Sequence, residues 1–186
     1  SFLLYDRLSR ALAMLPALGS DMADEIGIDR ERMGRYLRFL HAEGVVKGAE
    51  IIPQRGRLYE QGTLVRFERL SREQPSATLL KFCAVWHRLH RRQTVAQIAH
   101  AAGLSEVVAG QIVAAMHRHR AARIGGWQST DSGPVALFDL LPGSDAPRPV
   151  KSRAEVNAEH WQRRREKLRA AGLRTHDSVQ QLQARA

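Results

Sequence analysis

Residues 29–46 have the sequence DRERMGRYLRFLHAEGVV, and this stretch carries the signals that decide the fold. Asp29 is a residue type that caps helices. The large apolar residues that follow recur at helical spacing on one face, at Met33, Tyr36, Leu37 and Leu40. Gly44 interrupts this pattern ahead of two β-prone valines. The stretch therefore predicts an amphipathic helix with an arginine-rich exposed side, which ends just before a strand.

The pattern around this helix occurs a second time in the chain, when residues 22–46 are laid over residues 98–124. Gly27 and Gly103, which are 76 residues apart, each close a short amphipathic helix, and Asp29 and Ser105 cap the helix that follows. The apolar stripe of the first copy corresponds in the second to Ala109, Ile112, Val113 and Met116. The chain is therefore predicted to contain an internal repeat of two helices joined by a tight turn.

Further predicted elements flank each copy. An apolar-periodic helix precedes each one, at residues 3–15 and 79–89. Two strand-like runs around a turn follow each one, with the turns at residues 53–56 and 129–134. Residues 64–67 could extend the first hairpin by a further strand. Each copy is thus predicted to have the order helix, helix, turn, helix and a two-stranded wing.

The first copy resembles the winged helix-turn-helix regulators of bacteria and of their phages and mobile elements, including the MarR-type group. The residues that carry the resemblance are Asp29, Arg32, Met33, Gly34, Arg35, Leu37, Leu40, Gly44, Val45 and Val46. In such regulators the helix after the tight turn enters the major groove, and the wing touches the minor groove or the backbone. The resemblance implies that the bases are contacted by Arg30, Glu31, Arg32, Gly34, Arg35 and Arg38.

These signals together predict a mainly α-helical fold with small β wings, made of two tandem winged helix-turn-helix units and a basic C-terminal helix or tail. The predicted boundaries are residues 1–67 for the first unit and main DNA reader, 68–78 for a connector, 79–141 for the second unit, 142–152 for a Pro/Gly linker and 153–186 for the basic helical tail.

The charge of the chain favours a polyanionic partner. Lysine and arginine outnumber the acids by 29 to 19, which gives a formal net charge of +10. More than half of this surplus lies between residues 148 and 174. We expect DNA contacts from the first wing at Arg55, Gly56 and Arg57, where arginine can enter a narrow minor groove, and from the tail at Arg163, Arg164, Arg165 and Lys167 beside Trp161.

The second copy departs from the first where DNA contacts would lie. Its corresponding helix offers Glu106, Val107, Val108 and Gln111 in place of arginines. Exposed valines favour docking of a protein, either a partner or a second copy of the chain, while a secondary DNA contact stays open because glutamate can accept from cytosine and valine can pack on a thymine methyl group.

Several other classes of protein are disfavoured by the sequence. Cys83, His87 and His90 lie on one helix, where the first and last continue an apolar stripe, and no fourth ligand is evident; no metal and no cofactor are expected. The chain contains none of the usual local catalytic motifs, so no enzyme is predicted. A single cysteine and the lack of a long apolar run favour a cytoplasmic, nucleoid-associated protein with no membrane contact.

A sequence-specific transcription regulator that binds double-stranded DNA is the leading hypothesis. Two alternatives remain open: a winged-helix interaction or architectural protein of chromosome or phage assembly, and a DNA-binding protein similar to a replication initiator.

Overall fold

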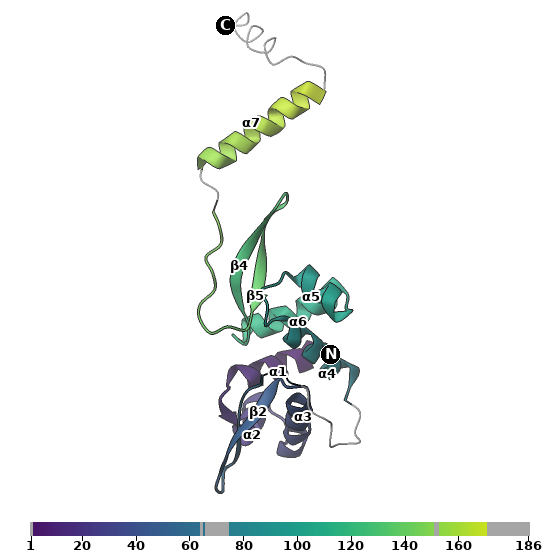
Figure 1. Cartoon of the computed structure of the whole chain (residues 1–186), viewed down its shortest axis with the longest axis vertical. Coiled ribbons are helices and arrows are strands. Elements are labelled where there is room, and N and C mark those ends of the chain that lie inside the picture. The colour runs from purple at the N-terminus through teal and green to yellow at the C-terminus, as the bar shows by residue number, and fades with distance from the viewer. Residues whose placement is uncertain (1, 64, 66–74, 151–152, 171–186) are drawn as a thin grey trace, which may run out of the picture. The chain divides into compact units, whose positions relative to one another are not determined.

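The computed structural model describes every residue except 1, 64, 66–74, 151–152 and 171–186. The described residues form seven helices and two small antiparallel sheets, of three and two strands (Figure 1). The chain divides into two compact units, Ser1–Pro147 and Arg148–Ala186. The described residues are therefore mainly helical with small β elements, as the sequence predicts.

The first half of the unit Ser1–Pro147 begins with three helices and ends in a hairpin. Its elements are α1 (Phe2–Ala13), β1 (Ala17–Leu18), α2 (Gly19–Ile26), α3 (Arg30–Ala42), β2 (Val46–Ile52) and β3 (Gly56–Gln61). Gly27 ends α2 in the left-handed conformation with a φ of 65°, which glycine adopts without steric cost. The Asp29 carboxylate accepts a hydrogen bond of 2.7 Å from the Arg32 N–H and so caps α3. The tight turn is thus built as predicted.

The strand β1 was not anticipated from the sequence. It pairs antiparallel with β3, with Ala17 opposite Tyr59 and Leu18 opposite Leu58, so the strand order is β1-β3-β2. Two residues are too few to show an alternating pattern, and their pairing depends on contacts with a strand some 40 residues away. β1 therefore ties the start of α2 to the hairpin.

The second half repeats this plan. Its elements are α4 (Ala77–Arg88), α5 (Val95–Ala102), α6 (Glu106–Arg118), β4 (Arg123–Thr130) and β5 (Gly133–Asp139). Gly103 ends α5 with a φ of 64°, and the Ser105 hydroxyl caps α6. Gln93 forms an isolated bridge with Phe138 of β5. Because Gln93 lies 76 residues after Ala17, the internal repeat extends to the strand pairing that precedes the second helix.

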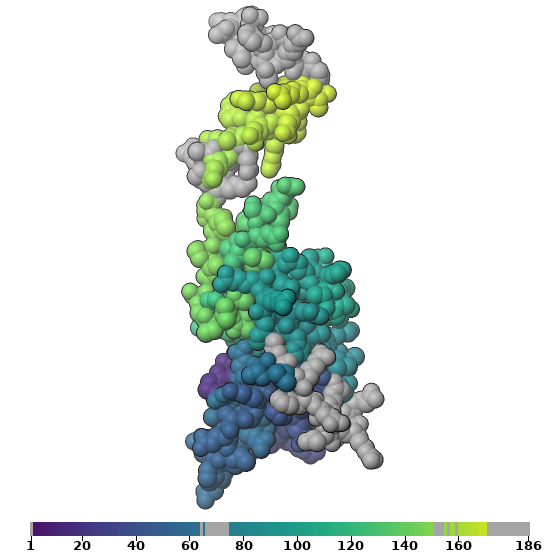
Figure 2. Space-filling model, in the orientation of Figure 1, coloured from purple at the N-terminus to yellow at the C-terminus, as the bar shows by residue number. Residues whose placement is uncertain are grey.

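The two halves share one hydrophobic core. The cluster of buried side chains includes Leu8 and Leu12 of α1 together with Ile112 and Met116 of α6, and α1 packs against α6 and α4 as well as α2. At the edge of this contact the Asp6 carboxylate lies 2.7 Å from an Arg118 nitrogen and 2.8 Å from His119 Nε2. Figure 2 shows the first half, in purple and blue, in direct contact with the second half, in teal and green. The two copies therefore form one packed body.

Some element boundaries differ from the predicted ones. α4 begins at Ala77, capped by the Ser76 hydroxyl, and therefore starts within the predicted connector. The second hairpin has a shorter turn than predicted, because β4 continues to Thr130 and β5 begins at Gly133. Of the strand proposed at residues 64–67, only residue 65 is described, and it is in no strand; the rest, and most of the connector, lie outside the described residues.

The start of the predicted linker is fastened to the second hairpin. The Asp145 carboxylate accepts a hydrogen bond of 2.8 Å from the Ile124 N–H and lies 2.8 Å from His117 Nε2, and the Ala146 N–H donates to the Ile124 carbonyl at 2.7 Å. Trp127 also donates its indole N–H to the Ala146 carbonyl. In a two-stranded sheet both strands are edges with unpaired backbone groups. This segment pairs two of those on β4, the N–H and the carbonyl of Ile124, without being a strand.

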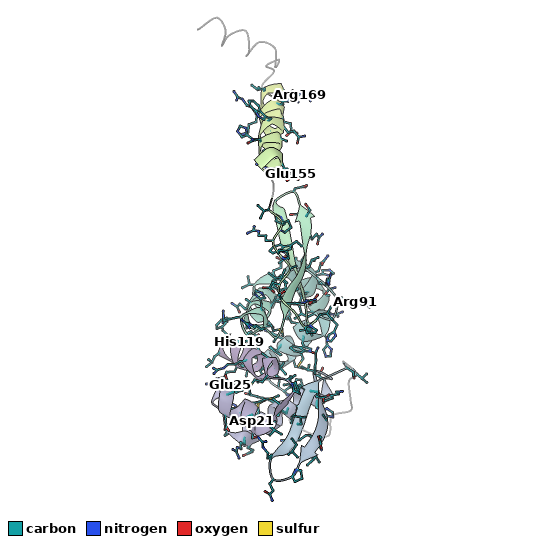
Figure 3. The ribbon with its side chains drawn as sticks, turned by 90° about the vertical axis from the view of Figure 1, so that its left-hand side faces the viewer. Asp21, Glu25, Arg91, His119, Glu155 and Arg169 are labelled. Atoms are coloured by element: carbon teal, nitrogen blue, oxygen red, sulfur yellow. The ribbon has the colours of Figure 1, made fainter. Side chains whose placement is uncertain are left out.

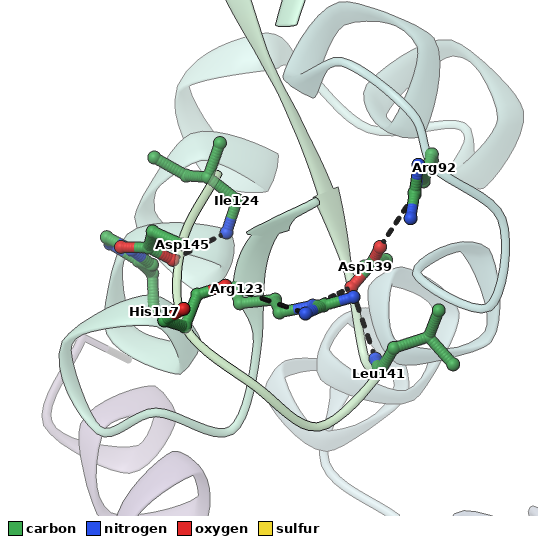
Figure 4. Close-up of polar contacts among 8 residues, drawn as sticks. Arg92, His117, Arg123, Ile124, Asp139, Leu141 and Asp145 are labelled. Atoms are coloured by element: carbon green, nitrogen blue, oxygen red, sulfur yellow. Dashed lines mark hydrogen bonds and ion pairs between the residues drawn. The ribbon is translucent and has the colours of Figure 1, made fainter. Parts of the chain in front are cut away.

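A buried carboxylate holds the base of the second hairpin. Asp139 is 2% exposed and accepts hydrogen bonds from Arg92 Nε at 3.0 Å, Arg123 Nε at 2.9 Å and the Leu141 N–H at 3.2 Å (Figure 4). Burial alone raises the pKa of Asp139, but these hydrogen bonds and the charge of Arg123 outweigh it and hold the pKa below its ordinary value. Gly125 is required beside it, because a Cβ there would collide with the carboxylate.

We expect the unit Ser1–Pro147 to lose stability in acid. Two further carboxyl groups have lowered pKa values: at Asp6, hydrogen bonds and charges from His119 and Arg118 outweigh the opposing effect of burial, and at Asp145 the Ile124 N–H is the main cause. A group whose pKa is lower in the folded state stabilises the fold above its unfolded pKa and loses that contribution as the pH falls through the folded value. Urea unfolding should therefore give a smaller free energy at about pH 3 than at about pH 6. The decrease should be smaller in Asp6→Asn, and equal free energies at both pH values would contradict the expectation.

In the unit Arg148–Ala186 the described residues form one helix, α7 (Arg153–Ala170). Its position agrees with the predicted basic helix. No single helix in the described part of the chain is long and apolar enough to cross a membrane, and α5 and α6 reach that length and apolarity only when taken together across a bend of 117°.

Candidate nucleic-acid interface

The predicted recognition helix α3 has one buried and one exposed side. Met33, Leu37 and Leu40 are buried in the core. The exposed side carries the predicted contact residues Arg30, Glu31, Arg32, Arg35 and Arg38, and Gly34 is half-buried between them. The helical spacing of the apolar residues therefore places the arginines together on the solvent side.

The arginines of α3 differ in their partners. Arg30 lies 3.8 Å from the Asp24 carboxylate, with both side chains largely exposed. Arg32 donates from Nε to the Tyr36 hydroxyl at 3.0 Å and lies over the Tyr36 ring. Arg35 and Arg38 form no hydrogen bond or ion pair with any of the described residues. The cationic groups of Arg35 and Arg38 are therefore available to an external anion or base.

The spacing of Tyr36 predicts that it belongs to the apolar stripe of α3. In the structure its hydroxyl also accepts the hydrogen bond of Arg32. It occupies the Nε of Arg32 and leaves the two terminal nitrogens of that guanidinium group to other partners. An arginine held in this way loses less side-chain freedom when it binds. No sequence pattern distinguishes this use of tyrosine from ordinary packing.

The tip of the first hairpin has a tightly bent backbone with two arginines. Gln54 and Gly56 have φ values of 64° and 105°, and Arg55 and Arg57 are exposed on either side of Gly56. Arg57 lies across β2 above Gly48, where a Cβ would come within 2.8 Å of Arg57 Cδ. Gly48 thus leaves the space in which the Arg57 side chain lies.

A shallow hollow of about 260 Å³ separates α3 from this hairpin, and we call it the first hollow. Its walls come from the start of α2, from α3 and from the hairpin, and they consist of Gly19, Ser20, Arg30, Gly34, Leu37, Arg55, Gly56, Arg57 and Tyr59. Three of these residues are arginines and none is acidic. The backbone N–H groups at the start of α2, which has no side-chain cap, add further positive potential. The first hollow is therefore suited to a phosphate or a sugar-phosphate strand.

The structure brings together predicted residues that are distant in sequence, and it adds others. Arg30 and Gly34 of α3 share the first hollow with Arg55, Gly56 and Arg57 of the hairpin. Gly19, Ser20 and Tyr59 were not predicted. The sequence gives little indication that Gly19 and Ser20 belong to this site, because their position depends on the pairing of β1 with β3, which holds the start of α2.

The corresponding surface of the second half has a different character. Val107 is 70% exposed, and Glu106 and Gln111 are exposed beside it. Val108, which we expected to be exposed, is half-buried and packs against the core. The second hairpin ends in Thr130, Asp131 and Ser132, without a basic residue. Figures 1 and 3 place the tips of the two hairpins at opposite ends of the unit, so the two surfaces do not form one continuous face.

The helix α7 carries its charge on all sides. The predicted contact residues Arg163, Arg164, Arg165 and Lys167 are all exposed, and Figure 3 shows side chains on both sides of the helix between Glu155 and Arg169. Trp161 is 54% exposed, and the Arg164 guanidinium lies 5.4 Å from the centre of its ring. A helix without an apolar face has no means of packing into a core, and this one offers cations to a polyanion from any direction.

The described residues contain no group of three or more His, Cys, Asp or Glu side chains placed to hold a metal ion. Cys83 is buried in the core and His87 lies within 3.9 Å of the Glu43 carboxylate. His90 does not continue this helix as predicted, because α4 ends at Arg88, and His90 lies exposed in the turn that follows. No protein-family model matches the chain, and no curated protein is similar to it.

Proposed function

We propose that this chain is a sequence-specific DNA-binding transcription regulator of bacterial or phage type, built from two tandem winged helix-turn-helix units. In this proposal α3 is the recognition helix, β2 and β3 form the wing, and the partner is double-stranded DNA in the cytoplasm. The observation that carries the proposal is the first hollow, where Arg30 of α3 and Arg55 and Arg57 of the hairpin line one surface without an acidic residue.

The proposed geometry follows from the shape of DNA. The major groove is wide enough for an α-helix, and an arginine that binds both O6 and N7 of guanine distinguishes that base from the others. Arg35 and Arg38, which lack partners among the described residues, and Arg32, held by Tyr36, are the residues we assign to base contacts. Arg55 and Arg57 lie on the wing, where arginines enter narrow minor grooves. The sugar-phosphate strand between the two grooves would then lie in the first hollow.

The helix α7 is proposed as a phosphate clamp. Its exposed basic residues lie on every side and provide no base-specific arrangement. Contacts with phosphates position a protein on DNA without selecting a sequence. The clamp would therefore raise affinity for all DNA equally.

Deleting residues 150–186 is expected to weaken binding to a selected site and to random DNA by the same factor. The salt dependence should become shallower by about 0.9 log units per lost phosphate contact, because fewer counterions are released. Fluorescence anisotropy at several salt concentrations measures both effects. An unchanged salt slope would show that the tail serves folding, self-association or another partner.

Selection of bound fragments from a random DNA library, with the purified full chain, tests the main proposal. Enrichment of a defined motif is the expected result. Retention without any sequence preference would exclude a sequence-specific regulator and favour an architectural protein or one similar to a replication initiator.

A second candidate function is that of a winged-helix interaction protein. The observation that favours it is Val107, which is 70% exposed on α6 between Glu106 and Gln111. In this candidate, Val107 with its two polar neighbours forms the contact with another protein. If the chain retains no DNA in the selection, the result would favour the interaction protein over the regulator.

A further inference from the structure

A second hollow of about 450 Å³ lies in the unit Ser1–Pro147, away from the proposed DNA contacts. Its walls come from both halves: the end of α1 and the turn after it, the base of the first hairpin, α4, and the chain before and after the second hairpin. The residues are Leu12, Ala13, Leu15, Pro16, Lys47, Glu60, Gln61, Trp86, Arg120, Ala121, Ala122, Arg123, Leu140, Leu141, Pro142 and Gly143. This volume is within the range of about 300–1,000 Å³ that is usual for small-molecule sites.

The walls of the second hollow are mostly apolar, with one cation that lacks a partner. Lys47 pairs with Glu60 at 3.0 Å, and Arg123 is bound to Asp139. Arg120 forms no side-chain hydrogen bond or ion pair with any residue that the structure describes. Its backbone has a φ of 61°, a left-handed conformation that is uncommon for arginine. An uncompensated positive charge therefore stands beside an apolar surface.

Trp86 places a buried indole group in the wall of the second hollow. Its side chain is 2% exposed, and its Nε1 has no hydrogen-bond acceptor in the described part of the chain. By contrast, Trp127 donates its Nε1–H to the Ala146 carbonyl. Nε1 has almost no accessible surface, so a molecule in the second hollow lies against Trp86 without reaching this N–H, and the indole signal reports its presence nearby.

We propose that the second hollow binds a small amphipathic anion. Its anionic group pairs with Arg120, and its apolar body lies on Leu12, Leu15 and Leu141, beside Trp86. Free single-headed anions with an apolar chain or ring have this chemistry. The proposal goes beyond DNA binding and is independent of it.

The test uses the full chain with nitrogen-15 in its three tryptophans, whose indole N–H signals are assigned by tryptophan-to-phenylalanine variants. Octanoate is the probe, and 1-octanol, which lacks the charge, is the matched neutral control. We expect octanoate to move the Trp86 signal in a saturable way, because Trp86 lies in the wall, while the signals of Trp127 and Trp161 stay in place. A Trp86 signal that does not move at any octanoate concentration would overturn the proposal.

Two substitutions test the role of Arg120. Asparagine tolerates the left-handed conformation, so Arg120→Asn should keep the fold and weaken octanoate binding roughly tenfold through the loss of a charged hydrogen bond. Arg91→Asn, which alters an exposed arginine outside the second hollow, should leave it unchanged. Leu141→Glu, at a position that is 56% exposed, should also weaken binding by placing a carboxylate on the wall. Equal affinity for octanoate and 1-octanol, or wild-type affinity in both Arg120→Asn and Leu141→Glu, would overturn the proposed anion site. None of these measurements requires DNA, so they are independent of whether the proposed regulator function holds.

Discussion

Replacing Asp139 by alanine is expected to lower the free energy of unfolding of the unit Ser1–Pro147 by about 3 kcal/mol, because removal of one partner leaves buried charges and donors uncompensated. The carboxylate binds Arg92, Arg123 and the Leu141 N–H at once. The Arg123 side chain is 21% exposed, so water can replace only part of what it loses, while Arg92 is 55% exposed and regains water readily. For this reason we take the lower end of the range of about 3–5 kcal/mol that is typical of broken buried pairs.

Urea unfolding followed by circular dichroism measures this loss. Asp131→Ala is the matched control, since Asp131 is an exposed acid at the tip of the same hairpin, and it should change the free energy by less than about 0.5 kcal/mol. Asp139→Asn, which keeps an acceptor oxygen but no charge, should fall between the two. A loss below about 1 kcal/mol in Asp139→Ala would mean that the segment 142–146 holds the hairpin without the carboxylate.

Local signals in the sequence predicted the features that depend on neighbouring residues. Gly27 and Gly103 end helices in the left-handed conformation, and Asp29 and Ser105 cap the helices that follow. Such motifs act within a few residues, so a single sequence is sufficient to find them. The same holds for the side of α3 that carries the arginines, because it follows from the 3.6-residue period.

Features that depend on distant contacts could not be predicted in this way. β1 pairs with a strand that is distant in sequence, and α1 packs on α6 of the other half. Nothing in the amphipathic pattern of α1 specifies which partner its apolar side will cover. Val108 lies on the predicted exposed side of α6, but the buried side of this helix is wider than the predicted apolar stripe, and the Val108 side chain packs against the core.

Only part of the candidate site could be predicted, because the rest of it also depends on contacts between residues that are distant in sequence. The spacing of residues on α3 and the Gly-Arg turn identified the two elements that carry the arginines, but not that they border one hollow. That arrangement requires β1, which holds the start of α2 beside Tyr59. The separate partners of Arg30 and Arg32 also depend on side-chain positions that no residue pattern encodes.

Arg35→Ala is expected to weaken binding to a selected DNA site about tenfold or more, and to weaken binding to random DNA much less. An arginine that binds a guanine with two hydrogen bonds contributes about 1–3 kcal/mol of discrimination, and Arg35 is exposed on α3 with no partner among the described residues. Arg32→Ala should have the same kind of effect, since Tyr36 leaves the terminal nitrogens of Arg32 to other partners. Fluorescence anisotropy with both DNAs at one salt concentration gives the two affinities, and Arg91→Ala, an exposed arginine of the second half, is the control for charge alone.

Arg35→Lys separates base contacts from phosphate contacts. Lysine keeps the positive charge but lacks the planar group that makes two parallel hydrogen bonds. If Arg35 binds a base, the lysine variant should keep its affinity for random DNA and lose most of its preference for the selected site. If Arg35 binds only phosphates, the lysine variant should resemble the wild type on both DNAs, and Arg35→Ala should weaken both equally, because phosphate contacts carry no sequence information. If the Arg32 and Arg35 variants both weaken binding to the two DNAs equally, α3 does not contact the bases. The first hollow would then be a site for the DNA backbone alone.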